Sequence, residues 1–232
     1  MKGRALIGCE VSGVVRRAFR AVGVEAWSCD LQPATDNSAH HITGDVLDVL
    51  GQGWDLAILH PPCNYLTVAC NGPMAHGCSL YTAADGRKLR AAAVEFFMAC
   101  INAPVARVCV ENPIGIMSTR CRKPDQIIQP FQFGHDASKA TCLWLRGLPP
   151  LTIDPSAFVK PRMVCKCGGV YSYELLFGSG CPHCGAEPAL ARPRWANQTN
   201  SGQNKLSPSP TRAAERAVTY EGVAKAMAAQ WG

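Results

Sequence analysis

A cysteine that directly follows two prolines is the residue of this sequence best placed for nucleophilic chemistry. Residues 56–59 form a short apolar run, Leu-Ala-Ile-Leu, of the kind that forms buried strands. Pro61 and Pro62 lack a backbone donor and cannot continue a central strand. Cys63 should therefore lie just past the carboxyl end of a strand, where open parallel sheets bind their ligands. We interpret Cys63 as a nucleophile, because a thiol is partly ionised near neutral pH and intrinsically reactive.

Three acidic residues are expected at the same edge of the sheet. Glu111 and Asp30 each follow a short apolar run, and Asp45 follows a polar loop. Asp30 lies 17 residues past Gly13, near the spacing of about 20 at which an acid binds ribose hydroxyls in dinucleotide-binding folds. As a set these acids favour a nucleoside-containing cofactor, although Asp is also common at helix caps and in turns.

Four cysteines in the second half of the chain form a metal-binding pattern. A Cys-x-Cys pair and a Cys-x-x-Cys pair, 13 residues apart, supply the thiolates of Cys165, Cys167, Cys181 and Cys184. Four thiolates on tight, glycine-containing turns match the tetrahedral geometry that zinc prefers. We expect a structural zinc ribbon, with a hairpin through the alternating residues Tyr171, Tyr173, Leu175 and Phe177. Lys and Arg outnumber Asp and Glu around it, so the ribbon could meet phosphates.

Alternating apolar runs and helical patterns supply the scaffold for these residues. Strands are predicted at residues 4–9, 24–29, 55–59 and 106–110, with a last pair at 131–134 and 140–145. Helices are predicted at residues 14–21 and 87–101, and at the end of the chain, where Tyr220, Val223, Ala224, Met227 and Trp231 recur at helical spacing. A turn-rich loop is predicted at residues 64–85. Strands that alternate with helices indicate βαβ units, so we expect an α/β fold with a doubly wound, mostly parallel sheet of Rossmann-like type.

Length and composition limit the class of protein. The 232 residues, 47% hydrophobic and 17% charged, can bury one full core with a small appendage. The net charge of +6 is compatible with a nucleic acid partner. No apolar run approaches the roughly 20 residues needed to cross a bilayer, and no export signal is visible. We expect a cytoplasmic monomer without a membrane partner.

Cysteine usage fits a reducing compartment, where thiols pack, bind metals or react rather than form disulfides. The chain has an odd number of cysteines, 13. Those outside the metal pattern, other than Cys63, are expected to pack as small apolar residues. They are Cys9, Cys29, Cys70, Cys78, Cys100, Cys109, Cys121 and Cys142.

Pro61-Pro62-Cys63, followed about fifty residues later by Glu111-Asn112, resembles the DNA cytosine carbon-5 methyltransferases, in a small, divergent, phage-like branch. The resemblance implies a catalytic core at residues 1–150, a zinc-ribbon target-recognition lobe at 155–196, and a linker with a closing helix at 197–232. It also implies S-adenosylmethionine as cofactor and double-stranded DNA as partner, in a bacterial or phage-infected cell. The implied cofactor contacts are Val11, Ser12, Gly13, Asp30, Leu31, Asp45, Val46 and Pro61.

The resemblance assigns roles in a covalent mechanism. Cys63 attacks carbon 6 of a flipped-out cytosine, while Glu111 holds and protonates N3. Asn64, Thr67 and Thr141 are implied substrate contacts. The family's Gln-x-Arg-x-Arg motif is replaced by Ala137, Lys139 and Thr141, so Lys139 is the expected catalytic cation, with Arg146 or Arg120 as possible replacements for the missing arginines.

Other readings of the sequence remain open. The same fold and nucleophile could act on RNA or a free pyrimidine nucleotide, or use a modified methyl donor. A zinc-ribbon DNA-binding protein on a catalytically dead sheet is a further alternative. An amino methyltransferase is disfavoured, because its Asp/Asn-Pro-Pro-aromatic signature would need an acid or Asn at His60 and an aromatic residue at Cys63.

Overall fold

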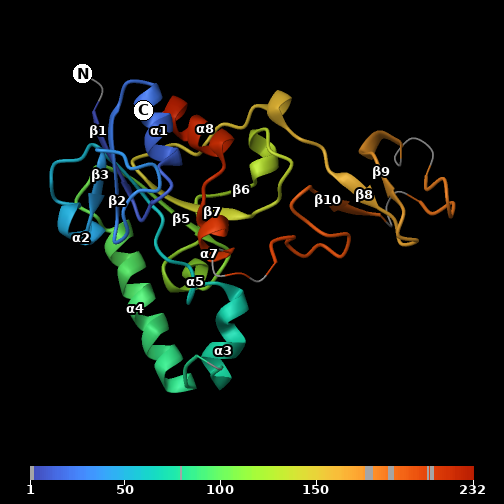
Figure 1. Cartoon of the computed structure of the whole chain (residues 1–232), viewed down its shortest axis with the longest axis horizontal. Helices are drawn as coiled ribbons and strands as arrows, with labels where there is room; N and C mark the ends of the chain where they lie inside the picture. Colours follow the sequence, from blue (N-terminus) through green and yellow to red (C-terminus); the bar gives the residue numbers. More distant parts are fainter. Residues whose placement is uncertain (1–2, 79, 176–179, 188–190, 208, 210–211) are drawn as a thin grey trace. The chain divides into compact units, whose positions relative to one another are not determined.

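The computed structural model describes residues 3–78, 80–175, 180–187, 191–207, 209 and 212–232 (Figure 1). The chain divides into two compact units. The core unit comprises residues 1–128, 140–152 and 218–232, and the ribbon unit comprises residues 129–139 and 153–217. Residues 129–139 and 197–217 thus group with the ribbon, while the roles given above to the three sequence segments stay predictions.

The described part of the core unit contains a seven-stranded sheet in the order β3-β2-β1-β4-β5-β7-β6. Its strands are β1 (Arg4–Gly8), β2 (Glu25–Asp30), β3 (His41–Thr43), β4 (Leu56–Leu59), β5 (Arg107–Pro113), β6 (Gln126–Ile128) and β7 (Thr141–Arg146). Strands β1 to β5 pair in parallel, whereas β7 runs antiparallel to both β5 and β6. The predicted mostly parallel α/β sheet is confirmed.

The described part of the core unit also contains helices. They are α1 (Val14–Ala21), α2 (Val46–Val49), α3 (Asn71–His76), α4 (Ala83–Ile101), α5 (Met117–Arg120) and α8 (Glu221–Trp231), with a 3₁₀ turn η1 at Val68–Cys70. Helices α1 and α8 pack against each other, and α8 buries Val223, Met227 and Trp231, as the helical spacing predicts (Figure 1). Among the described residues, no helix is long and apolar enough to cross a membrane.

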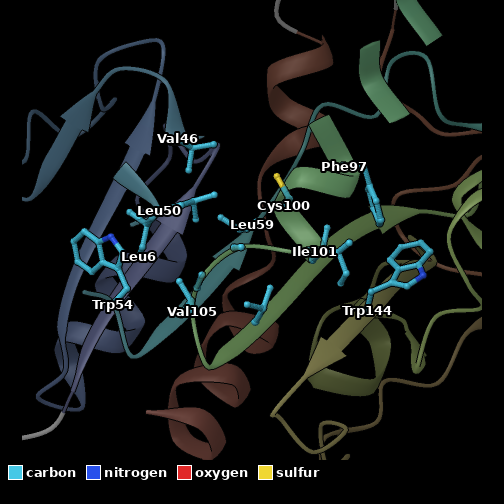
Figure 2. Close-up of a cluster of buried hydrophobic side chains, with 14 of the residues drawn as sticks. Leu6, Val46, Leu50, Trp54, Leu59, Phe97, Cys100, Ile101, Val105 and Trp144 are labelled. Carbon is cyan, nitrogen blue, oxygen red and sulfur yellow. The ribbon is translucent and has the colours of Figure 1, made fainter. Parts of the chain in front are cut away.

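Continuous buried runs along the central strands build the core, as expected for a sheet covered on both faces. Leu6, Leu59 and Trp144 belong to one buried cluster that the C-terminal half of α4 covers with Phe97, Cys100 and Ile101 (Figure 2). Phe97 meets Trp144 edge-on, with ring centroids 5.0 Å apart. This packing anchors only the last turns of α4, and Figure 1 shows its first turns extending from the sheet to α3.

The segment predicted as a turn-rich loop is partly helical. Helix α3 lies inside residues 64–85, and α4 begins at Ala83 rather than at residue 87. The earlier start follows from Thr82, whose side chain caps the helix by accepting from the backbone N–H of Asp85 at 3.2 Å. The prediction missed this cap because it followed the apolar face, which begins further along the helix.

The ribbon unit corrects two strand predictions. Its elements are η2 (Pro130–Phe133), η3 (Pro155–Ala157), β8 (Arg162–Val164), β9 (Val170–Tyr171), β10 (Arg192–Arg194) and α7 (Arg212–Ala217). Residues 131–134 were predicted as a strand, but Pro130 and the reciprocal caps of Gln129 and Gln132 form a 3₁₀ turn. The predicted hairpin through Tyr173 and Leu175 is also wrong, because β9 ends at Tyr171 and pairs with β8; Phe177 lies outside the described residues.

Candidate active site at the carboxyl edge of the sheet

The chain reverses its direction of winding at β1. Strands β2 and β3 lie on one side of β1, and β4 and β5 lie on the other. In open α/β sheets the loops that leave the carboxyl ends of two such strands part and form a crevice that binds ligands. The loop after β1 carries Val11, Ser12 and Gly13, and the loop after β4 carries Cys63. The topology therefore brings the predicted cofactor turn and the predicted nucleophile to one edge.

The Cys63 loop is held by hydrogen bonds to itself and to the end of β5. The carbonyl of Cys63 accepts from the backbone N–H groups of Leu66 and Thr67, at 3.0 and 3.3 Å. The Asn112 side chain, 3% exposed, donates to the carbonyl of Pro61 at 2.8 Å. Gly115 lets the chain approach closely, because a Cβ there would overlap the Leu66 carbonyl. Cys63 thus sits on a fixed turn, half-buried.

The Glu111 side chain lies next to the Cys63 loop, within salt-bridge distance of the His60 ring. Leu59 pairs with Val110, so the next residue of each strand, His60 and Glu111, lie level across the sheet. The His60 Nδ1 atom is 3.1 Å from Glu111 Oε2, and the side chains are only 13% and 10% exposed. Sequence reasoning placed Glu111 at this edge and missed His60; its only signal was its position directly before the two prolines.

Glu10, which sequence reasoning also missed, occupies the amino end of α1. Its carboxylate accepts from the backbone N–H of Val15 at 2.7 Å and of Arg16 at 3.3 Å, and its side chain is buried. The Ser12 hydroxyl donates to the same carboxylate at 3.4 Å. In dinucleotide-binding folds these first-turn amides bind the pyrophosphate. Because the Glu10 carboxylate already accepts from these amides, they are not available to a phosphate group. A cofactor that binds at this turn would therefore not place a phosphate at the amino end of α1.

The remaining predicted cofactor contacts lie along the ends of β2 and β3. Asp30 accepts from the backbone N–H of Gln32 at 3.0 Å, and Leu31 beside it is 75% exposed. Asp45 caps α2 by accepting from the backbone N–H of Leu47 at 2.9 Å. Val46 packs into the core, and Pro61 is buried at the start of the Cys63 loop. Burial, and then the nearby charges of Cys100 and Asp30, raise the pKa of Cys9, so acid and thiol lie close together at this edge.

A buried ion pair fixes the loop that follows Asp30. The Arg16 guanidinium, 1% exposed, donates to Asp36 Oδ2 at 2.5 Å and to the Ser28 hydroxyl at 2.8 Å. Arg17 donates to the same Asp36 oxygen at 2.6 Å. Burial alone raises the pKa of Asp36, but the hydrogen bonds from Arg16 and Arg17 outweigh it and lower this pKa to about 2.

Replacing Asp36 with asparagine is expected to lower the free energy of unfolding by about 3 kcal/mol at pH 7, because Arg16 would keep a buried charge without a carboxylate. The pKa of Asp36 is about 2 in the folded protein and about 3.9 when unfolded. The stabilisation is therefore complete above about pH 4 and is lost as the pH falls toward 2.

Urea unfolding at pH 7 and pH 3 checks this, and the wild-type advantage should shrink at pH 3. Asp48→Asn, which removes an exposed carboxylate from α2, is the control and should change stability by less than about 0.5 kcal/mol. An Asp36→Asn deficit that is equal at both pH values would contradict the ion-pair argument.

The predicted substrate contacts have different positions in the fold. Thr67 bridges to Gly115 next to the Cys63 turn, and Asn64 is exposed on that turn. Thr141, 7% exposed, starts β7 opposite Pro113, two residues from Glu111. Lys139 belongs to the ribbon unit, where its backbone N–H donates to the Gln129 side chain at 2.9 Å. The structure thus groups Thr67 and Thr141 with Cys63 and Glu111 in the core unit.

The two arginines named as possible replacements for the missing motif have different positions in the core unit. The Arg146 guanidinium donates to the carbonyls of Ala103 and Val105, just before β5 begins, at the opposite edge of the sheet. Arg120 is exposed at the end of α5.

Most of the other cysteines pack as predicted. Burial raises the pKa of Cys100 to about 12 and of Cys29 to about 11, and it raises the pKa of Cys109 and Cys142 as well. Cys78 is an exception: it is exposed, and a hydrogen bond from the backbone of Leu80 lowers the pKa of its thiol. Packing does not explain Cys78, and chemical labelling of Cys63 has to allow for it.

The four predicted metal ligands converge in the ribbon unit. The sulfur atoms of Cys165, Cys167, Cys181 and Cys184 all lie within 4.8 Å of one another. Two of the sulfur pairs are 3.6 and 3.7 Å apart. Zinc–sulfur bonds of about 2.3 Å in a tetrahedron place sulfurs about 3.8 Å apart, so the donor set fits zinc. Gly168 and Gly185 have positive φ angles of 87° and 65° on the two knuckles, as their predicted turns require.

No family model and no curated protein matches this sequence. Among solved structures, the chain is similar to a DNA modification methyltransferase encoded within a prophage of E. coli, with 11% identity and a TM-score of 0.39. It is also similar to the Dnmt2 methyltransferase of S. pombe, with 17% identity and a TM-score of 0.38. The matches cover 62% and 64% of this chain and 46% and 50% of those proteins, so the chain spans about half of their length. The strand order found here is that of a doubly wound, mostly parallel α/β sheet.

Proposed function

We propose that the protein is an S-adenosylmethionine-dependent methyltransferase that modifies carbon 5 of cytosine in DNA. One observation carries the proposal: the loop that holds Cys63 and the end of β5 that holds Glu111 leave adjacent parallel strands at the carboxyl edge, and the Asn112 side chain bonds the Pro61 carbonyl of that loop. A nucleophile and a buried carboxyl group at one edge of the sheet suit addition to carbon 6 and protonation of N3 of one pyrimidine ring.

The residues of the chain divide the work as follows. The Cys63 thiolate forms a bond to carbon 6, and the ring electrons move toward N3, where a protonated Glu111 donates its proton. When bound, S-adenosylmethionine would supply the methyl group that carbon 5 of this adduct accepts. A base then takes the carbon-5 proton, the bond from Cys63 to carbon 6 breaks, and Glu111 regains the N3 proton. His60 holds the Glu111 carboxyl group in place throughout.

The proposed cofactor fits the amino-terminal half of the core unit. Glu10 occupies the α1 amides, which disfavours a dinucleotide and suits a nucleoside without phosphates. Asp30 is placed at the end of β2, where an acid binds ribose hydroxyls, and the exposed Leu31 offers an apolar surface to a base. Asp30, Asp45 and Glu10 also favour a positively charged sulfonium at this edge.

The covalent step can be tested with double-stranded DNA in which cytosine is replaced by 5-fluorocytosine. Fluorine cannot leave carbon 5 as a cation, so the enzyme should remain bonded to the DNA. We expect an adduct that survives denaturation, requires S-adenosylmethionine, and maps to Cys63 by peptide mass spectrometry. Cys78→Ser removes an exposed thiol of the core unit and should form the adduct at the wild-type rate.

The outcomes separate the proposed function from its alternatives. An adduct with single-stranded RNA but not with DNA would favour the RNA reading. DNA binding without any adduct, and without cofactor binding, would favour a catalytically inactive protein that binds DNA through its zinc ribbon. An adduct that persists in Cys63→Ser would exclude the mechanism proposed here.

A further inference from the structure

A guanidinium group from α4 reaches the loop that carries Cys63. The Arg90 Nε atom donates to the backbone carbonyl of Tyr65, two residues past Cys63, at 2.9 Å. The two residues are 25 positions apart in the chain, so this bond ties the first half of α4 to the turn of the nucleophile. It also fixes the plane of the guanidinium, because the Nε–H direction is set by the Tyr65 carbonyl.

One nitrogen of this guanidinium has no acceptor. Arg90 Nη2 is buried and makes no hydrogen bond with any residue in the described part of the chain. A buried charged donor without an acceptor is unfavourable and rare in folded proteins, so the arrangement indicates an acceptor that arrives with a ligand. Guanidinium groups bind anionic oxygens most strongly, and phosphate matches their planar geometry.

We propose that Arg90 binds a phosphate oxygen of the nucleotide whose base is presented to Cys63. This inference rests on the proposed function and names a residue for the substrate site that the sequence motifs do not provide. Arg146 lies at the opposite sheet edge, and Lys139 belongs to the other compact unit. Arg90 is in the core unit and is bonded to the nucleophile's own loop.

The test measures the rate of covalent adduct formation with 5-fluorocytosine DNA as a function of DNA concentration and salt. Arg90→Met should raise the DNA concentration for half-maximal rate by about tenfold, because one charge-assisted contact is lost. The slope of log affinity against log salt should fall by about one. Arg90→Lys keeps the positive charge but loses the planar guanidinium that can donate two parallel hydrogen bonds. It should recover part of the DNA affinity and most of the salt dependence.

Arg87→Met is the matched control, because Arg87 is exposed on the same helix three residues earlier. It should change the half-maximal DNA concentration less than twofold. If Arg87→Met and Arg90→Met have equal effects, only the general charge of α4 matters and the inference is overturned. A lower maximal rate for Arg90→Met at unchanged half-maximal concentration and unchanged salt slope would also overturn it, since Arg90 would then only position the loop.

Adduct formation by the wild-type protein tests the proposed function, and comparison with Arg90→Met tests the role of Arg90. If the wild-type protein forms no adduct, the proposed function fails, and the inference fails with it. If the wild-type protein forms the adduct and Arg90→Met matches it in half-maximal concentration and salt slope, the inference alone fails. Thermal unfolding of each variant, expected within a few degrees of wild type, shows that the comparison is made on folded protein.

Discussion

Replacing Glu111 with glutamine is expected to lower the rate of methyl transfer to DNA by about 10³-fold, within the range of about 10²–10⁴ typical of a positioned general acid. Glutamine has nearly the same shape and can still donate a hydrogen bond, but it cannot transfer a proton to N3. Without that proton the negative charge that follows attack by Cys63 stays on the ring. Both adduct formation and methyl transfer should therefore slow together.

The binding of S-adenosylmethionine should be unchanged in Glu111→Gln, because the proposed cofactor residues lie on the loops after β1, β2 and β3. Transfer of a labelled methyl group gives the rate, and calorimetry gives the cofactor affinity. Glu95→Gln, which changes an exposed glutamate of α4, is the matched control and should keep the wild-type rate. A Glu111→Gln rate within threefold of wild type would mean that Glu111 does not act as the acid.

The positions of the proposed catalytic residues Cys63 and Glu111 at one sheet edge were predictable from the sequence, because they depend on local patterns. An apolar run that ends in prolines locates the end of β4, and a second run locates β5. Parallel strands then bring Cys63 and Glu111 to one edge without any knowledge of loops. His60 was not predictable, since its partner is set by the register of Leu59 with Val110, which no local pattern reveals.

Capping contacts account for most of what sequence reasoning missed. Glu10 reaches forward to the amides of Val15 and Arg16, and Thr82 starts α4 before its apolar face begins. Pro130, with its flanking glutamines, converts an alternating Phe-Gln-Phe segment into a 3₁₀ turn. In each case a side chain that accepts from backbone amides determines the local structure. Such hydrogen bonds cannot be inferred from the pattern of apolar residues alone.

Arg90 illustrates the same difficulty in the site. Helix α4 was interpreted through its apolar side, whose residues Phe97 and Cys100 cover the sheet. The polar side of its first turns gave no distinguishing signal, because arginines on exposed helix faces are common. The bond to the Tyr65 carbonyl and the burial of Nη2 separate Arg90 from Arg87, three residues earlier on the helix. The role proposed for Arg90 depends on which loop packs against the first turns of α4, and the tertiary fold determines that contact.

The four-cysteine site is expected to hold zinc, and removal of that metal is expected to unfold the surrounding part of the ribbon unit while the core unit stays folded. The described apolar cluster around the site is small, with Met163, Cys165, Cys181 and Ala186 buried and Tyr171 and Ala191 packed against them. Such a cluster cannot offset the chain entropy of its segment, whereas structural zinc contributes about 10–16 kcal/mol of apparent binding free energy. The core unit has its own large buried cluster and needs no metal.

Elemental analysis should find one zinc per chain, and a strong chelator should abolish hydrogen-exchange protection of the amides near the four cysteines only. Cys181→Ser should have the same effect without chelator, because a buried ligand is lost from a closed tetrahedral site. Cys78→Ser, which changes an exposed cysteine outside the site, should keep the zinc and the protection. Full protection in metal-free Cys181→Ser would show that the cysteines pack without a metal. Loss of protection in the core unit as well would show instead that the two units fold together, so the exchange pattern tests both the zinc site and the independence of the units.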